Sequence, residues 1–109
     1  MAKKAFDKLL LEVVDDTLLS LGDSARQAIY FHLEDKFEIT KNDIPCRVED
    51  FAEGLEKIFG LGAKFLEILM MKKLYEKIGQ PLKWNENKEL MFVQYVTAAE
   101  KSFLKRKRS

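Results

Sequence analysis

The stretch Ala63–Ile78, AKFLEILMMKKLYEKI, decides the predicted fold. At about 100° per residue, its apolar side chains fall on nearly every side of a helix, with lysines and glutamates between them. A helix that is apolar on most sides has to be covered on most sides. We therefore expect this segment to be the centre of a helical core.

Apolar residues recur at three- and four-residue spacing on both sides of the central segment, which predicts four further helices over residues 2–21, 25–37, 48–59 and 86–104. We expect Gly22 to end the first helix in the left-handed conformation, and Asp23 or Ser24 to cap the second. Gly60-Leu61-Gly62 should turn helix 48–59 back onto helix 63–78, so that the two form a helical hairpin.

The connectors and the composition complete the predicted architecture. In the connector after residue 37, Thr40 and Asp43 have the spacing of a capping box, and Ile39 and Ile44 should anchor it to the core. No segment alternates apolar and polar residues as a strand does. With 109 residues, of which 47% are apolar, the chain is the size of one domain. The sequence therefore predicts an all-α fold, with one compact domain over residues 1–104 and a disordered basic tail over 105–109.

Location is expected to be cytoplasmic. The longest uncharged apolar runs are far shorter than a membrane span, and the first residues lack the apolar stretch of a signal peptide. The single cysteine, Cys46, excludes an internal disulfide framework and fits a reducing compartment.

Catalytic chemistry finds little support in the sequence. His32 is the only histidine, and no nucleophile surrounds it at a spacing typical of a catalytic site. Pairs of adjacent acids point about 100° apart on a helix and do not form a cooperating pair. One histidine and one cysteine cannot supply a zinc site. We expect no enzymatic activity, no metal and no cofactor.

Apolar surface beyond what one core needs is the feature that favours assembly. The first, central and last helices each carry more apolar side chains than a single contact requires, and methionines adapt easily to irregular contacts. We expect a homodimer, or a docked protein partner, at an interface that contains Met70, Met71, Leu74, Phe92, Val96 and Phe103. The competing interpretation is a monomer whose five helices cover one another completely.

Two alternatives remain open. A nucleic-acid-associated protein would hold phosphates without sequence preference through Lys101, Lys105, Arg106, Lys107 and Arg108. Residues 1–104 carry a formal charge of −3, so such binding would rest on the last few residues and Lys101. A solubilising, disordered end is the favoured interpretation of residues 105–109. A sensor of a small apolar ligand would use a pocket among Phe31, Phe65, Trp84 and Tyr95.

The middle of the chain resembles a known family. The runs LGDSARQAIYFHLEDKFEITKNDIP (residues 21–45) and VEDFAEGLEKIFGLGAKFLEILMMKKLYEKIG (residues 48–79) are similar to the Nitrosopumilus output domain family, small archaeal helical domains found alone or attached to signalling proteins. The resemblance rests on short pairs and triplets such as Ala28-Ile29-Tyr30, Ile44-Pro45 and Leu74-Tyr75. None of them is a catalytic motif. The resemblance implies an archaeal signalling context, with no established activity and no functional residue to carry over.

Overall fold

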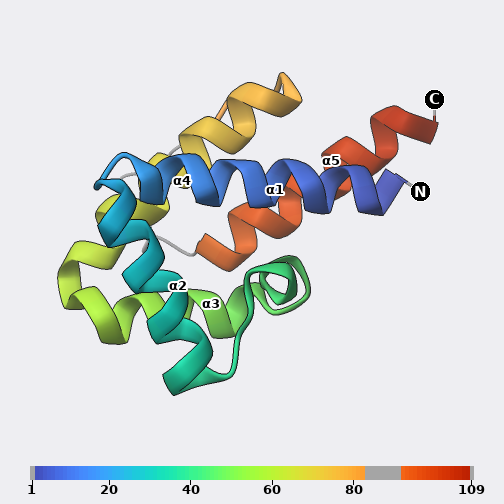
Figure 1. Ribbon diagram of the computed structural model, residues 1–109. Coiled ribbons are helices and arrows are strands. Elements are labelled where there is room, and N and C mark those ends of the chain that lie inside the picture. Colours follow the sequence, from blue (N-terminus) through green and yellow to red (C-terminus); the bar gives the residue numbers. More distant parts are fainter. Residues whose placement is uncertain (1, 83–91, 109) are drawn as a thin grey trace.

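Helices and short connectors make up the described part of the chain. The computed structural model describes residues 2–82 and 92–108 (Figure 1). These residues form α1 (Ala2–Leu19), α2 (Asp23–Phe37), η1 (Lys41–Cys46), α3 (Val48–Phe59), η2 (Gly60–Gly62), α4 (Ala63–Ile78) and α5 (Phe92–Arg108), where η marks a 3-10 helix. Over these ranges there is no strand, and the all-α prediction is confirmed.

Three helices, α1, α4 and α5, pack against one another and form the larger part of the core. The hairpin of α3 and α4, joined by η2, brings α3 against α4, and α2 packs on both α1 and α3 (Figure 1). The radius of gyration is 13.6 Å, close to the value of about 13 Å for a compact domain of this length. None of the described helices is both long and apolar enough to cross a membrane.

The central helix α4 is covered as the sequence predicts. Its buried side chains are Ala63, Leu66, Glu67, Met70, Met71, Leu74 and Ile78, and it packs against α1, α3 and α5. Gly79 ends it in the left-handed conformation, with φ 71° and ψ 30°. The amides of Gly79 and Gln80 donate to the carbonyl oxygens of Glu76 and Tyr75, which satisfies the last turn. The predicted bounds of α3 and α4 are confirmed.

The junction between α1 and α2 differs from the prediction. Gly22 has φ 109° and ψ 149°, which is outside the left-handed helical region, and α1 has already ended at Leu19. Gly22 instead precedes the first residue of α2, and no side chain caps that helix. The carboxylate of Asp23 accepts hydrogen bonds from the side chains of Arg26 and Gln27, and so it is turned away from the free amides of the first turn.

The connector after α2 is built as the sequence predicts. The amide of Thr40 donates to the carboxylate of Asp43 over 3.1 Å, one half of a capping box, at the start of η1. Ile39 and Ile44 are each 1% exposed, and they anchor the connector in the core.

The end of α5 corrects the predicted tail. Residues 105–108 continue the helix, so a disordered segment does not begin at 105. Two contacts hold this end in place: Phe103 packs against Phe6 with ring centroids 5.7 Å apart, and Arg106 donates to the carbonyl oxygen of Ile78. The expected start of this helix, at residue 86, lies outside the described residues.

Candidate association surface

An apolar hollow of about 400 Å³ lies where α2 packs against the end of α3. It is lined by Leu21, Ala25, Ala28, Ile29, His32, Ile58 and Phe59. All but His32 are apolar, and Ala25 and Ala28 lie one turn apart on α2. Because alanine side chains are short, another backbone or a large side chain can approach α2 closely at this point.

Two exposed apolar side chains belong to residues that come shortly after Phe59, a lining residue of the hollow, in the sequence. Leu61, in η2, is 88% exposed, and Phe65, in the first turn of α4, is 75% exposed. Leu61 is two residues after Phe59, and Phe65 is one turn further on. We call the hollow together with Leu61 and Phe65 the association surface.

The backbone of the hairpin explains why Leu61 faces water. Gly60 ends α3 with φ 59° and ψ −130°, a conformation that disfavours a side chain. The chain then turns through η2, none of whose residues is buried, before α4 begins. Leu61 therefore projects from the outside of a tight turn and has no place in the core.

Close packing of α2 on α3 brings the two walls of the hollow together. A Cβ atom at Gly54, in the middle of α3, would lie 2.8 Å from a methyl carbon of Leu33 and 3.5 Å from the ring of Phe37. Leu33 is 1% exposed and cannot move aside freely. The missing side chain at Gly54 therefore lets α2 approach α3 at this distance.

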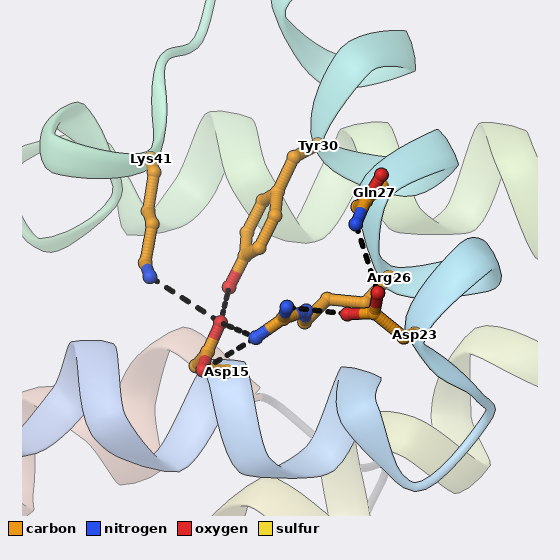
Figure 2. A network of polar contacts seen from close by, with 6 residues as sticks. All are labelled: Asp15, Asp23, Arg26, Gln27, Tyr30 and Lys41. Atoms are coloured by element: carbon orange, nitrogen blue, oxygen red, sulfur yellow. Dashed lines mark hydrogen bonds and ion pairs between the residues drawn. The ribbon is translucent and has the colours of Figure 1, made fainter.

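A polar network on another side of α2 fixes the rotation of this helix about its own axis (Figure 2). Asp15 of α1 accepts hydrogen bonds from the hydroxyl of Tyr30 over 3.0 Å and from Arg26 over 3.1 Å, both on α2. Lys41 of η1 reaches the same carboxylate over 3.3 Å and lies 5.4 Å from the centre of the Tyr30 ring. With Arg26 and Tyr30 held by α1, Ala25 and Ala28 are left to face the hollow.

The charge of Asp15 is stabilised by these partners. Partial burial raises the pKa of Asp15, but the hydrogen bonds from Tyr30 and Lys41 and the positive charges of Lys41 and Arg26 together hold it below its ordinary value. For the Tyr30 hydroxyl, burial and the hydrogen bond to Asp15 raise the pKa well above its ordinary value. Asp15 therefore remains a charged acceptor, and Tyr30 a donor, throughout the neutral range.

Glu67 is the one carboxylate on the buried stripe of α4, and it is 3% exposed. No hydrogen bond or ion pair to Glu67 is found within the described ranges. Burial, and then repulsion by Glu56 of α3, raise the pKa of Glu67 to about 7, although Lys64 works in the opposite direction. A carboxyl group in this position changes its charge near neutral pH.

The interface predicted from sequence is corrected by the burial of its residues. Met70, Met71, Leu74, Phe92 and Val96 are all between 0% and 4% exposed, and Phe103 is partly buried against the core. Because α1, α4 and α5 turn their wide apolar faces toward one another, these side chains fill the core of a single chain. The five buried side chains are therefore enclosed within this fold, and the most exposed large apolar side chains of the described residues lie elsewhere.

Of the four aromatic residues expected to line a ligand pocket, the three that the structure describes are spread over α2, α4 and α5. Phe31 and Phe65 are exposed, at 68% and 75%, and Tyr95 packs edge-on against Tyr75 with ring centroids 6.4 Å apart. The hollow beside Phe31 is lined otherwise by Glu34, Asp35 and Glu38, and is therefore acidic. Trp84 lies outside the described residues.

The basic residues named for nucleic acid lie on a helix and not on a tail. Lys101, Lys105 and Arg106 are exposed on α5, and a guanidinium nitrogen of Arg106 is 2.6 Å from the carbonyl oxygen of Ile78. Lys107 and Arg108 belong to the last turn of the same helix. The helix therefore fixes the spacing of these positions along its axis, and Arg106 among them lies at the end of α4.

Metal ligands are not gathered in the part of the chain that the structure describes, where no group of at least three His, Cys, Asp or Glu side chains could hold an ion. His32 is exposed at the hollow. Sequence reasoning missed Ala25, Ala28 and Ile58, whose apolar character is ordinary for core positions. A signal did exist at Leu61, an apolar residue between two glycines in a tight turn.

Comparison with protein-family models, with curated proteins and with solved structures found no match to this chain. The resemblance to the Nitrosopumilus output domain family therefore stays a prediction.

Proposed function

We propose that this protein is a small helical association module that forms a homodimer through the association surface. A second copy of the chain is the proposed occupant of the hollow between α2 and α3. The observation that carries the proposal is an apolar hollow lined in part by Phe59, followed closely along the chain by two apolar side chains, Leu61 and Phe65, that are more than 70% exposed.

Self-complementarity is the reason to choose a second copy. In a twofold dimer the same patch meets itself, so that each projecting residue of one protomer needs a recess on the same patch of the other. Leu61 and Phe65 supply the projections, and the alanines of α2 supply the floor of the recess. Under a twofold axis each hollow would receive side chains from the other protomer, and both sets of apolar groups would leave water together.

The energetics favour a weak, reversible dimer. Burying one large apolar side chain contributes about 1.5–3 kcal/mol, so the four side chains of two protomers contribute on the order of 10 kcal/mol. Association costs roughly 4–15 kcal/mol in lost freedom of motion. The difference is small, and we expect a dimer whose formation depends on concentration, with a dissociation constant on the order of micromolar or weaker.

A regulatory role in the cytoplasm completes the proposal. The regulatory role is supported by the resemblance to archaeal signalling domains, and the cytoplasmic location by the single cysteine. Neither depends on the geometry of the association surface.

Sedimentation equilibrium over a range of protein concentrations tests the dimer. Ala28→Glu places a charge on the floor of the hollow and Phe65→Ser removes a projection, and we expect each to weaken the dimer at least tenfold. Ala28 and Phe65 are both exposed, so each variant should keep its fold. Phe31→Ser is the matched control, because Phe31 is 68% exposed outside the association surface. A wild-type protein that stays monomeric at the highest concentration, or a control that weakens the dimer equally, would contradict the proposal.

A further inference from the structure

The two ends of the described chain lie side by side, which no periodicity of the sequence predicts (Figure 1). The ammonium group of Lys3, at the start of α1, is 3.5 Å from the carboxylates of both Asp7 and Glu100. Phe6 of α1 and Phe103 of α5 also meet, with their rings tilted by 50° and their centroids 5.7 Å apart. The first turns of α1 and the last turns of α5 therefore form one end of the molecule, which we call the basic end and define as residues 2–8 and 100–108.

Positive charge is concentrated at this end. Residues 2–8 and 100–108 contain eight basic side chains against only Asp7 and Glu100, a formal charge of +6. Because the whole chain carries +1, the remaining residues carry −5. Lys4, Lys8, Lys101 and Lys105 are all exposed. The small net charge of the chain thus conceals a strong separation of positive from negative charge.

We propose that the basic end binds the phosphate backbone of a nucleic acid without reading its sequence, using lysines of α1 together with those of α5. Several exposed cations on one rigid end can neutralise several successive phosphates, and each such contact releases bound counterions. The negative charge of the remaining residues would orient the molecule so that the basic end meets the polyanion first. This inference concerns a different surface from the proposed dimer contact and does not depend on it.

An anionic membrane fits the basic end less well. Stable membrane association of a basic helix normally requires an apolar face that enters the boundary between headgroups and acyl chains. At the basic end the aromatic side chains turn inward: Phe6 is 0% exposed, and Phe103 packs against it. The exposed large apolar side chains of the described residues, Leu19, Leu21, Phe31, Leu61 and Phe65, all lie outside the basic end.

The involvement of α1 distinguishes this proposal from binding by a flexible tail. If the last residues acted as a loose basic segment, lysines nearly one hundred positions earlier in the sequence would have no effect. In a rigid basic end, by contrast, Lys4 and Lys8 should contribute to nucleic-acid binding as much as Lys101 and Lys105 do. Arg106 is left out of the test because it also bonds to Ile78, so its loss would change stability as well as charge.

The experiment is fluorescence anisotropy of the full chain with a labelled random-sequence DNA duplex, and with a single-stranded RNA, as salt is raised from about 50 to 200 mM. We expect binding that weakens steeply, with a slope of log K against log salt of about −4 on the duplex, as four or five phosphate contacts would give. The double variants Lys4→Gln with Lys8→Gln, and Lys101→Gln with Lys105→Gln, should each reduce that slope by about 2. The double variant Lys36→Gln with Lys57→Gln removes the same charge from α2 and α3 and should leave the slope unchanged.

Four outcomes would overturn the proposal: no binding at the lowest salt, a loss confined to the α5 variant, an equal loss in the α2 and α3 control, or binding to phosphatidylserine vesicles without binding to either nucleic acid. Melting curves of every variant show whether it is folded under the conditions of the titration. A variant that unfolds is replaced by the corresponding single substitution, Lys8→Gln or Lys101→Gln, for which the expected change in slope is about 1.

Discussion

The guanidinium of Arg106 donates a hydrogen bond of 2.6 Å to the carbonyl oxygen of Ile78, the last residue of α4. A helix C-terminus carries free carbonyl groups and a partial negative charge, both of which a cation satisfies. Arg106 thus caps the central helix from a position 28 residues further along the chain. The contact also explains why α5 stays ordered to Arg108, although its last residues form a run of like charges.

Removing this cap should destabilise the protein. Arg106→Ala should lower the free energy of unfolding by about 1 kcal/mol in urea denaturation, since it removes a charged hydrogen bond at a partly exposed site. Lys101→Ala is the control, because Lys101 is an exposed cation on the same helix, and it should change stability by less than about 0.5 kcal/mol.

Gly79 provides a second test of the same contact. Gly79 has φ +71°, and a Cβ atom there would lie 3.2 Å from the guanidinium nitrogen of Arg106 that bonds to Ile78. Gly79→Ala should therefore destabilise by about 1 kcal/mol or more, partly through backbone strain and partly through this contact. Its cost should be smaller when Arg106→Ala is also present. If the destabilisation of the double variant equalled the sum of the two single variants within about 0.5 kcal/mol, the two residues would not be coupled.

Asp15 should make the protein less stable as the pH falls into the acid range. Its pKa is lowered in the folded state, so the stability it contributes is present above the ordinary pKa of 3.8 and is lost as the pH falls through the folded value. Asp15→Asn should cost about 1–2 kcal/mol at neutral pH, and the difference from wild type should shrink below pH 3.8. The neighbouring Asp16 is exposed, and Asp16→Asn is the control. Equal costs for the two substitutions would refute the role of the network.

Glu67 should make the protein less stable as the pH rises toward neutrality. Its pKa is about 7 in the folded protein against an ordinary 4.5, so it ionises more readily once the chain unfolds. The contribution of Glu67 to stability should be most favourable below pH 4.5, fall as the pH rises from 4.5 to 7, and level off above that range. Glu67→Gln should therefore stabilise the protein above pH 7 by up to about 3 kcal/mol, with little change near pH 4.5.

Urea denaturation of Glu67→Gln across this pH range measures the effect. Glu34→Gln, at an exposed position on α2, serves as the control and should leave the pH profile unchanged. If the wild type and Glu67→Gln showed the same profile, the carboxyl group would not be ionising in the buried position that the structure gives it.

Features that depend on neighbouring residues could be predicted from the sequence, whereas features that depend on contacts between distant residues could not. The bounds of α3 and α4, and the pairing of Thr40 with Asp43, depend on residues within a few positions of one another, and they were predicted correctly. The end of α5 depends on Phe6 and Ile78, which are distant in sequence, and it was predicted too early.

The position of the association surface could not be predicted for a similar reason. Periodicity identifies which side of each helix is apolar, but it does not say which apolar sides face one another. The methionines of α4 proved to be enclosed by α1, α3 and α5, whereas Leu61 and Phe65, at a turn, remained outside. Ala25 and Ala28 gain their significance only from the packing of α2 on α3.

In the proposed dimer, the association surface of one copy meets the same surface of another. Isotope-filtered nuclear Overhauser spectroscopy, on an equal mixture of labelled and unlabelled protein, measures contacts between protomers directly. We expect intermolecular signals that connect the side chains of Leu61 or Phe65 to the methyl groups of Ala25 or Ala28. A dimer whose intermolecular signals arise only from other residues, or a sample that gives no such signals at any concentration, would contradict this expectation.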